Sequence, residues 1–196
     1  MAKLLPFLES GRIEAGCDEA GRGCLAGPVV ASAVILDEQT ALSLNLDDSK
    51  KLSEKKRDAL RTSIEEKALA WSVAFVSNEK IDEINILQAS FLAMRKAVDQ
   101  LFIRPDHILI DGNRFISSAT MPPNTCIIKG DGKYSSIAAA SILAKTHRDE
   151  YMKNAALEFP GYHWDKNAGY PTVQHRESLK TLGKTSLHRL SFKPCK

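Results

Sequence analysis

The chain has 196 residues, of which 43% are hydrophobic and 26% charged, which is the composition of a folded globular protein and excludes a disordered one. No apolar run is long enough to span a bilayer and no secretory signal precedes the first strand, so we expect no membrane association and a cytoplasmic location. The net charge of +3 is too small to indicate a nucleic-acid partner by itself.

The first half of the chain predicts three strands and one helix. Ile13–Cys17 and Val29–Leu36 are apolar and predict strands, joined by the glycine-rich turn Ala20–Gly27. Ser53 is a favourable N-cap and predicts a charged helix directly after it. Ala70–Val76 then predicts a third strand.

The middle of the chain predicts two long helices with two strands between them. From Asn78 to Leu101, apolar residues recur at spacings of three and four, which predicts one helix with a continuous apolar stripe. His107–Ile110 and Thr125–Ile128 are short apolar segments that predict strands. A second long helix is expected from about Tyr134 to Leu157.

The last part of the chain predicts a loop and one helix. The segment Phe159–Tyr170 is rich in aromatic residues, and Thr172 is expected to cap a helix that Gly183 ends. Strands interspersed with long helices predict an α/β fold with a mixed central sheet flanked by helices. The length suits a single domain spanning residues 1–196.

Positive charge is concentrated near the C-terminus. Residues 160–196 carry seven Lys or Arg residues against Asp165 and Glu177, a net charge of +5, so the first 159 residues carry −2. A basic C-terminal helical segment, about 160–196, is typical of a surface that binds phosphates, although a solvated helix face would have the same composition.

Carboxylates stand at the end of three predicted strands. Asp18 and Glu19 follow the first strand, Asp111 follows His107–Ile110, and Asp131 follows Thr125–Ile128. If these strands are neighbours, four carboxylates converge at one edge of the sheet, where sites of α/β proteins gather. Taken singly, each carboxylate is better explained as a solvated strand-end or turn residue, and only their joint pattern favours a site.

Converging carboxylates need cations to offset their repulsion. Oxygen ligands with no nearby Cys or His favour Mg²⁺ or Mn²⁺ over zinc. Two such ions, about 3.5–4 Å apart, can activate a water and stabilise a leaving oxygen in phosphodiester hydrolysis. The four cysteines have no metal-binding spacing and predict reduced thiols.

The turn Gly21-Arg22-Gly23 is a second candidate site, because glycines let a ligand approach the backbone closely. Arg22 could bind a phosphate, or could hold the turn by binding a carboxylate. A dinucleotide-binding loop fits poorly, because Asp18 and Glu19 would repel a pyrophosphate and the turn leads into a strand instead of a helix.

The segment from Gly16 to Val30, GCDEAGRGCLAGPVV, resembles the signature of bacterial ribonuclease HII, a type 2 ribonuclease H. The resemblance covers nearly the whole chain. The other segments that carry it, in order, are Asp48–Ser53, Ile110–Gly112, Lys129–Asp131, Ala139–Lys145 with Arg148-Asp149, Ala168–Tyr170 and His188–Phe192. The ribonuclease H-like fold that it implies agrees with the α/β fold predicted above.

The resemblance implies roles for particular residues. Four of them fall on the family's metal-binding, catalytic carboxylates: Asp18, Glu19, Asp111 and Asp131. The turn Gly21, Arg22, Gly23 falls on the segment that recognises the ribose 2′-hydroxyl and its phosphate, and Tyr170 on the tyrosine that senses that hydroxyl and packs on the next deoxyribose. Lys50 matches a basic position near the substrate backbone.

The implied activity is that of an endonuclease with two Mg²⁺ or Mn²⁺ ions. It would hydrolyse the RNA strand of RNA–DNA hybrids and incise duplex DNA on the 5′ side of embedded ribonucleotides, leaving 3′-hydroxyl and 5′-phosphate ends, as in DNA replication and ribonucleotide excision repair. We expect a monomer. Two alternatives remain open: another metal-dependent nuclease on the same fold, and a non-catalytic hybrid-binding protein.

Two departures from relatives bear on these expectations. The sequence ends soon after His188–Phe192, so the helical C-terminal extension of some relatives is not expected, nor is a sliding-clamp-binding motif. Only about a dozen residues precede the first strand, which disfavours the ribonuclease HIII type with its added N-terminal domain. Asp149 is expected in a structural ion pair, whereas His163, His175 and His188 are equally explained as substrate contacts or as surface residues.

Overall fold

The computed structural model of the protein describes residues 4–47, 49 and 52–196. Five strands and seven α-helices form its framework, with a short 3₁₀ turn before the longest helix. In chain order the elements are β1 (Glu14–Ala20), β2 (Val29–Ile35), α1 (Glu38–Ser43), α2 (Glu54–Lys67), β3 (Ala70–Val76), α3 (Asn78–Ile84), α4 (Ile86–Asp99), β4 (His107–Asp111), β5 (Asn124–Ile127), η2 (Gly130–Gly132), α5 (Ser135–Glu158), α6 (Trp164–Asn167) and α7 (Val173–Leu182).

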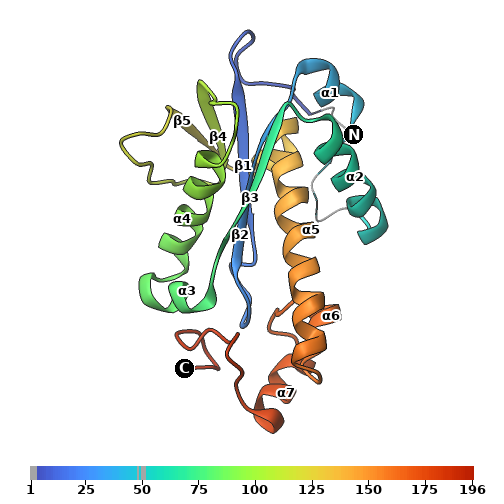
Figure 1. The fold of residues 1–196 in the computed structure, drawn as a ribbon, viewed down its shortest axis with the longest axis vertical. Helices are drawn as coiled ribbons and strands as arrows, with labels where there is room; N and C mark the ends of the chain where they lie inside the picture. The colour runs from blue at the N-terminus through green and yellow to red at the C-terminus, as the bar shows by residue number, and fades with distance from the viewer. Residues whose placement is uncertain (1–3, 48, 50–51) are drawn as a thin grey trace.

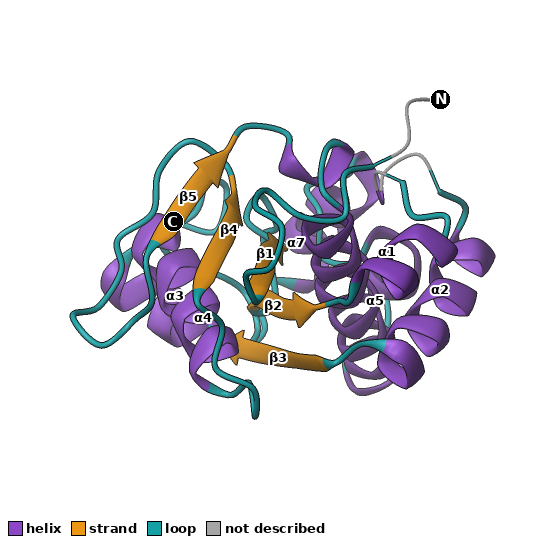
Figure 2. Cartoon of the chain, turned by 90° about the horizontal axis from the view of Figure 1, so that it is seen from above, coloured by secondary structure: helices purple, strands orange, loops and turns teal. Residues whose placement is uncertain are grey.

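The strands form one mixed sheet in the order β3-β2-β1-β4-β5, which confirms the predicted fold class. β1, β2 and β3 pair antiparallel, whereas β4 is parallel to both β1 and β5. Helices cover both faces of this sheet, with α4 on one side and α5 on the other (Figures 1 and 2). The three parallel strands therefore end at the same edge of the sheet.

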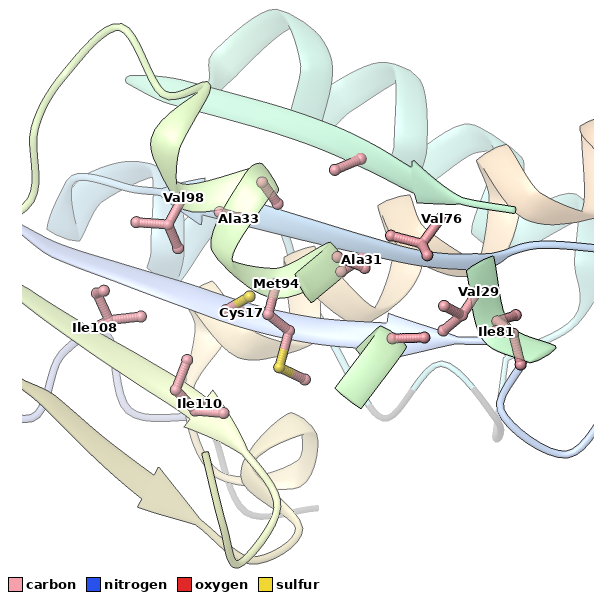
Figure 3. Packing of buried hydrophobic residues seen from close by; sticks show 14 residues of the cluster. Cys17, Val29, Ala31, Ala33, Val76, Ile81, Met94, Val98, Ile108 and Ile110 are labelled. Atoms are coloured by element: carbon pink, nitrogen blue, oxygen red, sulfur yellow. The ribbon is translucent and has the colours of Figure 1, made fainter. Parts of the chain in front are cut away.

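One face of the sheet packs against α3 and α4. Val29 and Ala31 on β2 meet Met94 and Val98 on α4 in a core of aliphatic side chains, with Ile81 of α3 closing its end (Figure 3). The alternation of buried side chains along the strands places this set on the same face. Ile81, Met94 and Val98 belong to the apolar stripe that the sequence predicted over residues 78–101.

The other face packs against α5 and α2. Ala139 and Ala140 on α5 lie in a buried cluster with Val34 of β2 and Ile64 of α2. Small residues let α5 approach the sheet closely, and the closest approach is at Gly16, where an added Cβ would lie 2.1 Å from the carbonyl carbon of Ser136. The position of β1 against α5 therefore depends on the absence of a side chain at Gly16.

The single helix predicted over 78–101 was wrong, because the structure has two helices that meet at Asn85. Asn85 has φ = 66°, the left-handed conformation, which ends α3. Its side-chain oxygen accepts hydrogen bonds from the backbone N–H groups of Leu87 and Gln88 and so begins α4. The apolar stripe continues across this break, which is why the sequence pattern did not reveal it.

Several predicted boundaries are confirmed. Ser53 caps α2 and Thr172 caps α7, each by accepting a backbone hydrogen bond in the first turn, and Gly183 ends α7. The expected loop 159–170 contains one short helix, α6 (Trp164–Asn167). Among the described residues, no helix is both long and apolar enough to cross a membrane.

Candidate active site

The carboxylates at the strand ends come together because β1, β4 and β5 are neighbours. Cys17 of β1 pairs with Ile110 of β4, so the next residues, Asp18 and Asp111, extend from adjacent strands at the same level. The expectation that β1 ends before Asp18 was wrong, because β1 continues to Ala20, which pairs with Val30 of β2. The predicted convergence of Asp18 with Asp111 is nevertheless found.

A cavity of about 250 Å³ opens at this edge of the sheet. It collects most of the residues that the sequence singled out, although they come from segments far apart in the chain. Its lining comprises Asp18, Glu19, Ala20, Gly21, Arg22, Gly23, Ser49, Arg57, Asp111, Ser141, Lys145 and Tyr170. Lys50, the remaining basic candidate, lies outside the described residues.

Asp131 stands beside this cavity but is not part of its lining. It lies in η2, directly after Gly130, whose N–H donates a 2.7 Å hydrogen bond to Oδ1 of Asp111. Only 4% of Asp131 is exposed. Across residues 4–47, 49 and 52–196, no three carboxylate, imidazole or thiol side chains are grouped closely enough to hold a metal ion as placed, so the four-carboxylate metal site stays a prediction.

The surroundings of Asp18 and Glu19 disfavour the charged form of both carboxylates. Burial raises the pKa of Asp18 well above its usual value, and the nearby Glu19 and Asp111 raise it further, against a hydrogen bond from Ser141. Burial also raises the pKa of Glu19, whereas Arg22 lowers it. A divalent cation among these oxygen donors would relieve the repulsion, so the donor set fits Mg²⁺ or Mn²⁺.

Asp18→Asn should raise the free energy of unfolding of the metal-free protein at pH 7 by about 1 kcal/mol. The folded-state pKa of Asp18 lies above the unfolded value, so its charged form destabilises the fold and the penalty fades as pH falls through the folded pKa. The advantage of Asn should therefore shrink as the pH is lowered. Urea unfolding in chelator at several pH values measures this, and a variant less stable than the wild type at pH 7 would contradict it.

Arg22 binds a carboxylate in this structure. Its Nη1 lies 3.1 Å from Oε1 of Glu19, and the Arg22 side chain is 53% exposed. The sequence left open whether Arg22 binds a carboxylate or a phosphate, and the structure shows the first. The Glu19 side chain of this pair is only 9% exposed, so the pair is open to solvent on the Arg22 side.

Two buried arginines that the sequence did not single out hold the turn 20–28. The Arg189 guanidinium donates to the carbonyl oxygens of Gly21 (2.7 Å) and Arg22 (2.9 Å), as well as to those of Gly27 and Pro28. Arg148 donates to the same Pro28 carbonyl and to two further ones, which belong to Ala26 and Ala168. Both arginines lay within segments that resemble the family, but nothing in the sequence indicated that they are buried.

Tyr170 also lines the cavity, and 38% of it is exposed. The Lys145 ammonium and the Arg148 guanidinium each lie 5.9 Å from the centre of its ring. Burial raises the pKa of Tyr170, and the neighbouring Cys24 raises it further. Lys145 also forms a 2.6 Å ion pair with Asp149, which confirms the structural role expected for Asp149.

A hydroxyl pair and a second arginine complete the lining. Ser49 and Ser141 are hydrogen-bonded through their hydroxyls at 2.9 Å, which joins the segment before α2 to α5. Arg57 donates to the carbonyl oxygens of Ser49 (3.1 Å) and Leu52 (2.6 Å). Ser141 stands out in sequence as a polar residue after an alanine run, whereas no pattern distinguished Arg57.

The histidines correct a further expectation. His175 and His188 are buried, with 0% and 1% exposure, so neither is a surface residue or available for direct contact with substrate. Trp164 is buried beside them and packs instead of facing solvent. His163 lies outside this buried cluster, at the residue before α6.

The comparisons with known proteins agree with this geometry. Residues 15–195 match the family model described as Ribonuclease HII. Ribonuclease HII of Parabacteroides distasonis is 62% identical over 189 residues, which are 96% of this chain and 94% of that protein.

Solved structures support the same assignment. A chain of the PCNA:RNase HII complex from Archaeoglobus fulgidus is 29% identical with a TM-score of 0.79, over 92% of this chain and 95% of that one. Bst-RNase HIII in complex with Mn²⁺ has the same fold, with a TM-score of 0.75 at 19% identity over 94% of this chain and 68% of that one. The sequence match over almost the entire length, on a shared ribonuclease H-like fold, shows that this chain belongs to the ribonuclease HII family of nucleases.

Proposed function

We propose that this chain cleaves the RNA strand of RNA–DNA hybrids and incises duplex DNA on the 5′ side of an embedded ribonucleotide, leaving 3′-hydroxyl and 5′-phosphate ends. The observation that carries the proposal is the cavity that joins carboxylates from adjacent parallel strands to the Gly21–Gly23 turn and to Tyr170. Acidic and phosphate-binding groups thus face one another across a space that a nucleotide can enter.

The proposed cofactors are two Mg²⁺ or Mn²⁺ ions, held by Asp18, Glu19, Asp111 and Asp131. The relative Bst-RNase HIII binds Mn²⁺, and the oxygen donors present here suit either ion. Bound to these residues, the ions would activate a water and stabilise the leaving oxygen of the phosphodiester. The protein's own contribution to that chemistry would be these four carboxylates, of which Asp18 and Asp131 are buried.

The chain's other residues would bind and orient the substrate. Arg22 would leave Glu19 for a phosphate once a bound cation balances the charge of Glu19, since the Arg22 side chain itself is exposed. Gly23 leaves its surroundings open, because an added Cβ would meet nothing within 4 Å, so a ribose can approach the backbone there. Tyr170 would pack against the next sugar, and Lys145 supplies positive charge beneath its ring.

The duplex beyond the cut site is proposed to contact the basic C-terminal segment. Arg176 and Lys180 of α7, together with Lys193, line a second cavity of about 480 Å³ on that part of the surface. These side chains are exposed, as phosphate-binding groups are in proteins that follow a nucleic-acid backbone. We propose that residues 1–196 act as one catalytic unit and as a monomer.

Tyr170→Ala should slow cleavage at a single embedded ribonucleotide about tenfold or more, because the ring that packs on the sugar is lost. Tyr170→Phe should have a smaller effect, since it keeps the ring and removes only the hydroxyl. Tyr151→Ala is the matched control, because Tyr151 is also partly exposed on α5 but does not line the cavity. Tyr170 is assigned to substrate binding and the carboxylates to metal binding. Weakened Mn²⁺ binding in Tyr170→Ala, measured by titration, would contradict this assignment.

The function is tested by incubating purified protein with a uniform RNA–DNA hybrid in Mg²⁺ or Mn²⁺ and identifying the product ends. We expect metal-dependent fragments with 5′-phosphates and 3′-hydroxyls, and none in chelator. Cleavage that persists in chelator, or that leaves 3′-phosphates, would overturn the proposed chemistry.

A further inference from the structure

A chain of hydrogen bonds runs through the buried histidines to the cavity. Trp164 donates its Nε1–H to Nε2 of His175 at 3.0 Å, and His175 Nδ1 lies 2.9 Å from the carbonyl oxygen of Tyr170. Indole N–H is only a donor, so Nε2 of His175 must be an acceptor and Nδ1 must carry the proton. His175 therefore donates to the Tyr170 carbonyl.

The second histidine extends this chain. The backbone N–H of Thr185 donates to Nδ1 of His188 at 2.9 Å, which makes Nδ1 an acceptor and leaves the proton on Nε2. His188 Nε2 lies 3.2 Å from Nε2 of His175, so the His188 N–H shares the single lone pair of that nitrogen with the Trp164 N–H. Burial lowers the pKa of both imidazoles, that of His188 to about 4, which keeps the pair uncharged at neutral pH.

The dipeptide His188-Arg189 thus contacts the Gly21–Gly23 turn directly and Tyr170 through His175. Arg189 holds the carbonyls of Gly21 and Arg22, while His188, through His175, reaches the carbonyl of Tyr170. Two backbone contacts, from Gly27 N–H to the Leu187 carbonyl and from Arg189 N–H to the Leu25 carbonyl, attach the dipeptide to the same turn. The position of Tyr170 relative to the turn is therefore linked to this one segment.

We propose that His175 and His188 are positioning residues that set Tyr170 against the Gly21–Gly23 turn and so determine recognition of the ribonucleotide. The proposal rests on the proposed function, because it assigns the histidines to the substrate-binding side of that site. Neither imidazole contacts substrate, since both are buried. They act through the carbonyl of Tyr170.

Two substitutions of His175 separate positioning from simple packing. His175→Asn places an amide N–H near the position of Nδ1 and can still donate to the Tyr170 carbonyl, whereas His175→Gln places its amide near Nε2 and cannot. We expect His175→Gln to reduce kcat for a single-ribonucleotide duplex about tenfold, and His175→Asn to retain activity within about threefold. Equal losses in the two variants, at matched folded fractions, would overturn the proposal.

A double-mutant cycle with Tyr170→Ala shows whether the effect passes through Tyr170. If His175 acts by positioning the ring, His175→Gln should have no further effect once the ring is absent. A tenfold loss that persists in the Tyr170→Ala background would overturn the proposal, because the histidine would then act elsewhere.

The hydrogen-bond chain itself can be measured without any cleavage. In ¹⁵N spectra of the wild-type imidazoles at pH 7, we expect the proton of His175 on Nδ1 and that of His188 on Nε2. The opposite assignments, or a cationic imidazole, would overturn the proposal even if the variants fail to fold. A wild-type protein with these tautomers that cuts no ribonucleotide-containing duplex would instead overturn the proposed function.

Discussion

Asp111→Asn should reduce the rate of hybrid cleavage by about 10³-fold or more. Asp111 lies at the end of β4, beside Asp18 of the neighbouring strand β1, and its carboxylate is proposed to bind the cations that activate water. Asparagine removes that charge with almost no change in volume. Initial rates at saturating Mn²⁺ measure the effect.

The fold should survive this substitution. Oδ1 of Asp111 accepts a hydrogen bond from the Gly130 N–H, and the amide oxygen of asparagine can accept it too. Asp106→Asn is the matched control, because Asp106 also accepts a backbone N–H, from Ile13, near the other end of β4. We expect it to change the rate less than twofold or so. Full activity and unchanged metal dependence in Asp111→Asn would remove this carboxylate from the mechanism.

Arg189→Met should lower the free energy of unfolding by about 3–5 kcal/mol, the largest stability effect that the structure indicates. The carbonyl oxygens of Gly21, Arg22 and Gly27 would lose their buried arginine donor, whereas that of Pro28 keeps its hydrogen bond from Arg148. Each unsatisfied buried acceptor costs about 1–3 kcal/mol. Burial lowers the pKa of Arg189 to about 10, so the guanidinium is still charged, and still a donor, at neutral pH.

Urea unfolding measures this loss. Arg176→Met is the control, because it is the same substitution at an exposed position of α7. We expect it to change the free energy of unfolding by less than about 0.5 kcal/mol. A loss below 1 kcal/mol in Arg189→Met, read against this control, would mean that the turn is held by other contacts.

Local signals in the sequence were sufficient for most of the fold. Cap residues such as Ser53 and Thr172 carry their own physical reason, because their side chains satisfy the first turn of a helix whatever the rest of the chain does. The break at Asn85 was missed because it depends on one left-handed residue, while the apolar periodicity is the same on both sides. The extension of β1 to Ala20 was missed for a similar reason. It depends on pairing with β2, which the local sequence of β1 does not reveal.

The site was predictable where it follows strand ends, and not where it depends on burial. Asp18 and Asp111 could be placed together because neighbouring parallel strands end at one edge. Arg148, Arg189, His175 and His188 could not be assigned, since their roles come from carbonyl groups distant in sequence. An isolated Arg or His in a basic segment has the same local sequence whether it faces solvent or supports a turn.

The most direct test of the proposed function uses a DNA duplex with one internal ribonucleotide, compared with the same duplex made entirely of DNA. The proposed arrangement of Arg22, Tyr170 and the carboxylates predicts a single metal-dependent cut on the 5′ side of the ribonucleotide and no cut in the all-DNA duplex. Equal cleavage of both duplexes would contradict it, because the cavity would then hydrolyse phosphodiesters without recognising the 2′-hydroxyl.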